Sequence, residues 1–84
     1  MSNEWTLHLA PMAIRFAYTL QRGEAVRLRD ALAVLKQGPA PDGVADLHVR
    51  DVYNIERDIF AISYQVVATQ RIMRVLLIER ARLA

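Results

Sequence analysis

The chain has 84 residues, of which 54% are hydrophobic and 24% are charged, and it contains no cysteine. This length suffices for one domain, residues 1–84, and excludes a second. The lack of cysteine excludes disulfides and thiolate metal sites and fits a reducing cytoplasm, where we expect the protein. No apolar run approaches the roughly 18–20 residues of a membrane span, and the start lacks the basic region of a signal peptide. We therefore expect neither a membrane protein nor a secreted one.

The net charge is +2, and the positive charge is unevenly distributed along the chain. A balance this weakly basic permits contact with nucleic acid without requiring it. The positive charge gathers in residues 71–84, where one acid, Glu79, accompanies four arginines: Arg71, Arg74, Arg80 and Arg82. We expect these arginines to contact a target, and a solvated strand edge and tail is the alternative.

The N-terminal half combines a strand pattern with two helix patterns. Apolar and polar residues alternate over 4–10, which predicts a half-buried strand that ends at Pro11. A helical spacing then predicts a helix to about residue 21, with the apolar stripe Ala13, Phe16, Ala17 and Leu20. A second helix is predicted from residue 24 to the Gly38-Pro39 stop, with the stripe Ala25, Leu28, Leu32 and Leu35.

The C-terminal half has the patterns of strands. Residues 38–43 are rich in proline and glycine and predict a loop, and three strands follow over about 50–57, 59–68 and 71–79. Short connections make these three strands antiparallel, while the first strand of the chain joins one edge. We predict an α+β fold with the order strand, helix, helix, three strands. The helical hairpin packs on one face of a small curved sheet, which is antiparallel or mixed.

Four segments, taken in order, carry a recognisable pattern: residues 10–13, 35–39, 58–66 and 74–80. The third, Asp-Ile-Phe-Ala-Ile-Ser-Tyr-Gln-Val, is similar to a Gly-Asp-Tyr-Arg-Ile-x-Tyr-x-Val motif, and the fourth to a final hydrophobic strand that often ends in a basic cluster. Together with the order of elements, these segments resemble the RelE/ParE superfamily of bacterial toxins from type II toxin–antitoxin modules. The resemblance covers nearly the whole chain.

Ribonuclease members of this superfamily cleave messenger RNA by attack of the ribose 2′-hydroxyl on the adjacent phosphate. This chemistry needs a base, an acid and a cation for the phosphorane. Ala61 stands where the resemblance places the arginine that neutralises the phosphate, and a methyl group cannot stabilise an anion. Residues 80–84 also lack the histidine or tyrosine that acts as the acid in many members.

Other residues offer a displaced catalytic set. This set would consist of Glu56 as the base, Arg57 and Arg80 as a phosphate clamp, and Tyr53 nearby. It would form if the strands brought these residues to one end of the sheet. The competing interpretation of Glu56 and Arg57 is a solvated cross-strand pair beside a turn. The two histidines, His8 and His48, are too few for a metal cage, and we interpret them as an exposed strand residue and a local hydrogen-bonding residue. We expect no metal and no cofactor.

Members of the ParE branch lack the ribonuclease residues and act by binding DNA gyrase. Because Ala61 replaces the phosphate-binding arginine, the resemblance favours a ParE-like toxin. Such a toxin arrests growth by binding gyrase and is not an enzyme. The resemblance also implies a cognate antitoxin, whose amphipathic segment lies along the helical hairpin and sheet. The alternatives are a RelE-like messenger RNA interferase, acting on free or ribosome-bound messenger, and a non-toxic oligomerising or adaptor protein of the same fold.

Both predicted helices carry apolar residues away from their main stripe: Met12, Ile14, Tyr18, Val26 and Val34. We expect them to form an antitoxin interface or a homodimer interface. The alternative is that they are ordinary singly exposed apolar residues.

Overall fold

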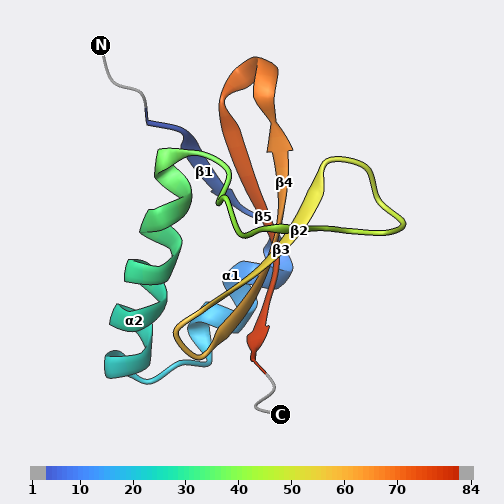
Figure 1. Ribbon diagram of the computed structural model, residues 1–84. Coiled ribbons are helices and arrows are strands. Elements are labelled where there is room, and N and C mark those ends of the chain that lie inside the picture. Colours follow the sequence, from blue (N-terminus) through green and yellow to red (C-terminus); the bar gives the residue numbers. More distant parts are fainter. Residues whose placement is uncertain (1–3, 82–84) are drawn as a thin grey trace.

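The computed structural model describes residues 4–81, which form two helices and five strands (Figure 1). In chain order they are β1 (Thr6–Leu9), α1 (Pro11–Tyr18), α2 (Arg22–Ala33), β2 (Val44–Ala45), β3 (Val52–Arg57), β4 (Phe60–Val67) and β5 (Ile72–Arg80). Two short 3₁₀ turns, η1 (Val34–Gln37) and η2 (Ala68–Gln70), follow α2 and β4. The predicted α+β fold is confirmed.

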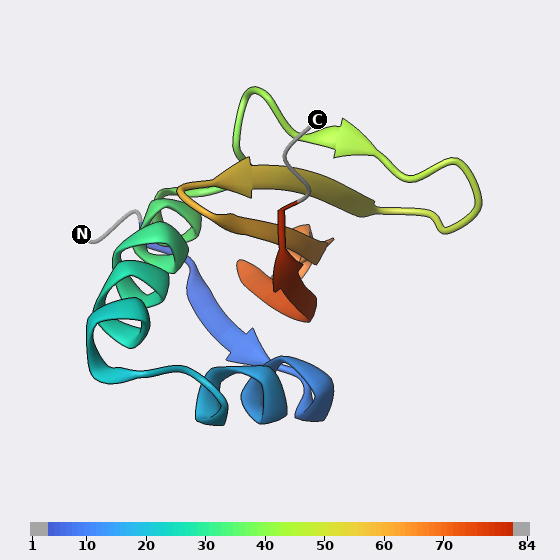
Figure 2. The ribbon, with the colours of Figure 1, turned by 90° about the horizontal axis from the view of Figure 1, so that it is seen from below.

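The strands form one mixed sheet in the order β1-β5-β4-β3-β2. Strand β1 runs parallel to β5, and the other neighbours are antiparallel. Strand β4 is therefore central and β1 lies at an edge, as predicted. Figure 2 shows α2 beside the sheet and α1 below its β1–β5 side, while no helix covers the opposite face of the sheet. We call that opposite face the open face.

The bounds of both helices differ from the prediction, and one strand was not predicted. Helix α1 ends at Tyr18 instead of about residue 21, and the Thr19 hydroxyl caps it by donating to the Phe16 carbonyl at 2.6 Å. Helix α2 begins at Arg22, so Gly23 lies within its first turn instead of before it. It ends at Ala33 instead of at Gly38, because the chain tightens there into the 3₁₀ turn η1. Strand β2 was not predicted, because its two exposed residues carry no alternation and are defined only by pairing with β3.

The core lies between the helices and the sheet. The Phe16 ring of α1 meets Phe60 of β4 edge to face, with centroids 6.2 Å apart. Phe60, Ile62 and Tyr64 are buried at alternate positions of β4, which confirms the predicted face of this strand. Burial of these large side chains is the main stabilising contribution to the fold.

A β-bulge changes the alternation of β5. Ser63 of β4 pairs with Leu77, but the next residue, Tyr64, pairs with Val75, so Leu76 is left without a partner. Because of this extra residue, Val75 and Ile78 are both buried although they are three positions apart. A strict period of two would have placed them on opposite faces.

Three ion pairs connect α2 and the 38–43 loop to the sheet. Arg27 of α2 binds Asp58 in the β3–β4 turn, and Arg80 of β5 binds Glu24 at 2.7 Å. Arg57 binds Asp42 with two hydrogen bonds of 2.6 and 2.7 Å. In each pair the hydrogen bond from the arginine is the main cause that lowers the carboxyl pKa.

These pairs predict a pH dependence of stability. A lowered pKa in the folded state means that the stabilisation is complete above the unfolded carboxyl pKa of about 4 and is lost as the pH falls through the folded value. We expect Asp58→Asn to reduce the fall in unfolding free energy between about pH 6 and about pH 3, measured by urea denaturation. Asp30→Asn is the control, because Asp30 pairs only with its neighbour Arg29 on α2. Equal slopes for Asp58→Asn and the wild type would contradict this prediction.

Gly43 is required by a close approach. A Cβ atom there would lie 2.7 Å from the Tyr64 hydroxyl, which accepts a hydrogen bond from the Ala40 amide at 3.3 Å. We expect Gly43→Ala to destabilise the protein by about 1–3 kcal/mol in chemical denaturation. Gly23→Ala is the matched control: nothing lies within 4 Å of its added methyl group. It should stabilise α2 by up to about 1 kcal/mol, and equal effects at both glycines would refute the packing argument.

Candidate functional site

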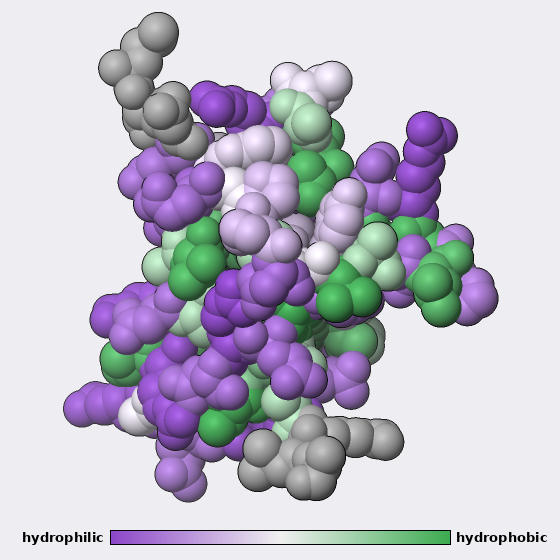
Figure 3. All heavy atoms as spheres, viewed as in Figure 1, coloured by the Kyte–Doolittle hydropathy of each residue, from purple (hydrophilic) through white to green (hydrophobic). Residues whose placement is uncertain are grey.

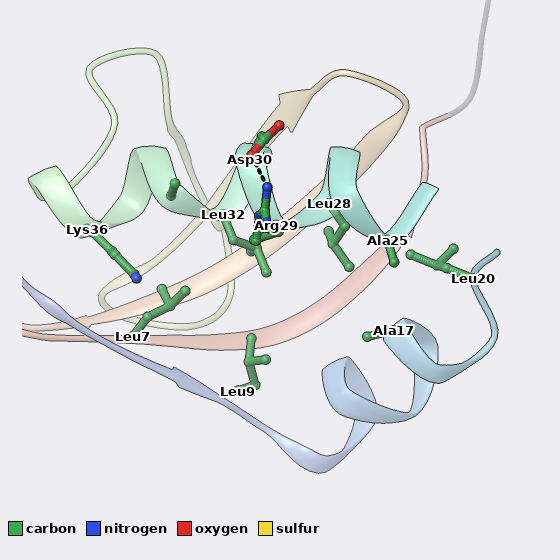
Figure 4. A pocket seen from close by; sticks show the side chains of 11 residues that line it. Leu7, Leu9, Ala17, Leu20, Ala25, Leu28, Arg29, Asp30, Leu32 and Lys36 are labelled. Atoms are coloured by element: carbon green, nitrogen blue, oxygen red, sulfur yellow. Dashed lines mark ion pairs between the residues drawn. The ribbon is translucent and has the colours of Figure 1, made fainter. Parts of the chain in front are cut away.

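An apolar groove runs between α2 and β1 and is closed at one end by α1 (Figure 4). Its volume is about 430 Å³. Its apolar lining includes Leu7 and Leu9 from β1, Ala17 from α1, Leu20 from the turn that follows α1, and Leu28 and Leu32 from α2. Arg29, Asp30 and Lys36 lie at its rim. A groove with this lining can bind an apolar side chain of a partner.

Small residues keep the groove unfilled. Ala17, Ala25 and Ala33 stand where longer side chains would bridge the helices and β1. Leu7, Leu9 and Leu20 are consequently only half-buried, although their spacing is that of core residues. Half-buried leucines that gather along one groove are a feature of surfaces that bind a partner.

The open face of the sheet carries an acidic row. Glu56 of β3, Ala61 of β4 and Glu79 of β5 are paired in register, so their side chains lie side by side on this face. The adjacent row contains Asn54, whose side-chain oxygen accepts a 2.6 Å hydrogen bond from the Ser63 hydroxyl. These residues line a hollow of about 450 Å³. A phosphate at Ala61 would meet two carboxylates and no cation from this row.

The structure does not bring the predicted catalytic set together. Arg57, Phe60 and Arg80 are register partners, so both arginines lie on the helix side of the sheet with the buried Phe60. Glu56, one residue before Arg57, points to the open face. Arg57 and Arg80 are also engaged by Asp42 and Glu24. Tyr53 stacks on Tyr64 at 5.9 Å between ring centroids and belongs to the packed side.

Among the predicted target-binding arginines, Arg71 directly precedes β5 and Arg74 and Arg80 lie on it. The Arg71 guanidinium lies over the Trp5 ring, 5.8 Å from its centroid. Arg74 is exposed and lies beside His8 in register, whereas Arg80 lies near the end of the strand. An extended strand advances about 3.3 Å per residue, which separates Arg71 from Arg80 by about 30 Å. Arg82 lies outside the described residues.

The apolar residues predicted to form an interface are exposed. Tyr18 is 86% exposed and Met12 60%, and Ile14, Val26 and Val34 are also exposed. A second exposed apolar set, not predicted from the sequence, lies on the arm between β2 and β3, where Leu47 is 92% exposed. The arm projects from the molecule, and its apolar surface is visible in Figure 3. The only signal in the sequence was an apolar residue at every second position of a polar loop, Leu47 and Val49.

The arm is held by its own hydrogen bonds. The Asp46 carboxylate accepts hydrogen bonds from the backbone amides of His48 and Val49 at 2.8 and 2.9 Å, and these amides lower its pKa. His48 therefore takes part in local hydrogen bonding through its backbone. Within residues 4–81, no group of three or more metal-ligating side chains occurs, and no helix is long and apolar enough to cross a membrane.

Searches of protein families and of curated proteins find no match to this sequence. Solved structures do match it. The isolated RelE toxin of E. coli superposes on it with a TM-score of 0.76 and 17% identity, over 95% of this chain and 87% of that one. This chain has the RelE fold.

Two toxin–antitoxin complexes contain chains with the same fold. A chain of the RelBE2 complex of Mycobacterium tuberculosis matches with a TM-score of 0.80 and 14% identity, over 93% of this chain and 99% of that one. A chain of the archaeal RelE–RelB complex of Pyrococcus horikoshii matches with a TM-score of 0.77 and 14% identity, over 96% and 99%. The RelE fold therefore accounts for nearly all of this chain.

The acidic row on the RelE fold predicts weak RNA binding. We expect Glu56→Gln combined with Glu79→Gln to raise the affinity for a short single-stranded RNA about tenfold at low salt, because two repulsive charges are removed. Fluorescence anisotropy measures this change, with Asp30→Asn as a charge-matched control on α2. Tight binding by the wild type that the two substitutions leave unchanged would contradict the prediction.

Proposed function

We propose that the chain is the toxin of a toxin–antitoxin pair and that its antitoxin binds in the apolar groove. The match to RelE over nearly the full length of the chain carries this proposal. The groove supports it, because its half-buried leucines offer an apolar surface to a partner. The exposed apolar residues of α1 and α2 extend that surface around the helices. We place this pair in the cytoplasm.

The matched structures favour a RelE-like target over gyrase. All the matches described above are to RelE or to complexes of RelE with RelB, which supports the RelE-like alternative better than the ParE-like prediction. We therefore propose messenger RNA on the ribosome as the target. The acidic row around Ala61 lacks the cation that phosphate cleavage needs. Cleavage by the free chain is not expected, and the ribosome must supply charge stabilisation.

The proposal is tested by inducing the chain in a bacterium. Growth arrest is expected, with ribosome-bound messenger cleaved or translation stopped within minutes, measured by RNA sequencing and amino-acid incorporation. A supercoiling assay with purified protein separates the two targets: blocked supercoiling with intact RNA would restore the gyrase-binding prediction. Normal growth with soluble, folded protein would overturn toxicity and favour the adaptor or homodimer alternative.

Arg74 and Arg80 are both exposed but lie on opposite faces of the sheet, so substitution of both tests either face for contact with the target. We expect Arg74→Ala combined with Arg80→Ala to relieve the arrest while the protein remains folded. Arg80 also binds Glu24, so Glu24→Gln is the matched control, since it weakens the same ion pair but keeps the arginine. The measurements are growth after induction and thermal unfolding of the purified variants. Relief of arrest by Glu24→Gln would show that the ion pair matters and not the contact of Arg80 with a target.

A further inference from the structure

We propose that the open face of the sheet is an interface between two copies of this chain, which pack face to face with their strands in opposite directions. This inference is independent of the proposed function, because the pairing of two copies requires neither an antitoxin nor toxicity. It also differs from the homodimer predicted from the sequence, which used the apolar residues of the helices.

The middle of the open face is formed by one row of three residues. Asn54 of β3, Ser63 of β4 and Leu77 of β5 are paired in register, and we call them the central row. Leu77 is only half-buried and lies outside the core between the helices and the sheet. No helix of residues 4–81 lies over this face (Figure 2). The central row therefore presents an apolar side chain that is uncovered in a single copy.

The charges of β5 are placed evenly on either side of the central row. Two residues away along β4 in one direction, Ala61 pairs with Glu79; two residues away in the other, Gln65 pairs with Arg74. Glu79 and Arg74 are both exposed. Neither forms an ion pair with any residue of 4–81. One face of one strand thus carries an acid and a base at equal steps from an apolar centre.

This arrangement makes the open face complementary to itself. A two-fold axis along the central row reverses the strand direction and places each strand over the same strand of the second copy. Glu79 of each copy then faces Arg74 of the other, and the two Leu77 side chains meet at the axis. Gln65 of the second copy faces Ala61, whose small side chain leaves the hollow described above. Opposite charges and matched side-chain sizes both favour this pairing.

The charges also select this direction of the strands. An axis parallel to the strands would place β5 of one copy over β3 of the other, so Glu79 would face Glu56. Like charges in contact are unfavourable. With the strands reversed, Glu56 faces the uncharged Val52 instead. The reversed arrangement is therefore the favourable one.

A second copy fits this face better than a nucleic acid does. Within residues 4–81, strands β3, β4 and β5 present one arginine on the open face, Arg74, against the carboxylates of Glu56 and Glu79. A phosphate chain would meet more repulsion than attraction there. A second copy supplies a carboxylate for Arg74 and a guanidinium for Glu79.

The test measures self-association of the full chain by sedimentation equilibrium between about 1 µM and about 1 mM. Because three strands provide a small interface, we expect a weak dimer with a dissociation constant of about 10–100 µM. Glu79→Arg and Arg74→Glu should each weaken the dimer at least about tenfold, since each change places like charges opposite one another. A mixture of these two variants should associate again, because every arginine then faces a glutamate.

Two further variants locate the interface. Glu56→Arg is the matched control: it makes the same change of charge as Glu79→Arg, in the same row, but faces no charged residue of the second copy. It should change the dissociation constant by less than about threefold. Leu77→Asp places two carboxylates at the axis and should abolish the dimer. Thermal unfolding shows whether each variant remains folded, and the mixing experiment decides the matter if Leu77→Asp does not.

Four results would overturn the inference. One is a monomer at the highest concentration, and another is equal weakening by Glu56→Arg and Glu79→Arg. The third is failure of the mixed variants to associate although each is folded. The fourth is a dimer that persists in Leu77→Asp and is lost in Tyr18→Asp, which would place the interface on the helices. Growth arrest has no part in these outcomes, so they leave the proposed function to its own test.

Discussion

The parallel pairing of β1 with β5 is the constraint on which the rest of the structure depends. The Thr6 and Ala10 amides donate to the Arg71 and Val75 carbonyls and bring the first and last strands of the described chain side by side. The intervening helices must then return across one face of the sheet, where Phe16 reaches Phe60. The same pairing leaves β1 at the edge of the sheet, opposite α2 across the apolar groove. The fold and the groove thus have one common cause.

The charged residues divide according to the face of the sheet. On the helix side, Arg57 and Arg80 are engaged by Asp42 and Glu24, and these pairs hold the 38–43 loop and α2 in place. The open face has an acidic end at Glu56 and Glu79 and a basic position at Arg74. Within residues 4–81, this division explains why no arginine faces the acidic row around Ala61: Arg57 and Arg80 point to the other side of the sheet and stabilise the fold.

The alternation of β4 was predictable, because Phe60, Ile62 and Tyr64 follow the period of a strand that is buried on one face. The bulge at Leu76 was not, since nothing in the run of apolar residues marks the extra residue. The candidate site was predictable only in part. The exposed residues of α1 and α2 were identified from their positions off the main stripe, whereas the groove was missed. Its leucines have the spacing of core residues, and only the alanines opposite leave them uncovered.

By itself, the sequence determined the order of the predicted elements, the face of each helix that is buried and the stop at Gly38 after the 3₁₀ turn η1, because these depend on local periodicity and backbone preference. It also indicated the fold through its resemblance to RelE and ParE toxins. Only the tertiary structure decided that Glu56 and Arg57, neighbours in the chain, act on opposite faces, and that Arg71 and Arg80 are far apart. Strand register and sheet order are contacts between distant residues, and they set which side chains meet.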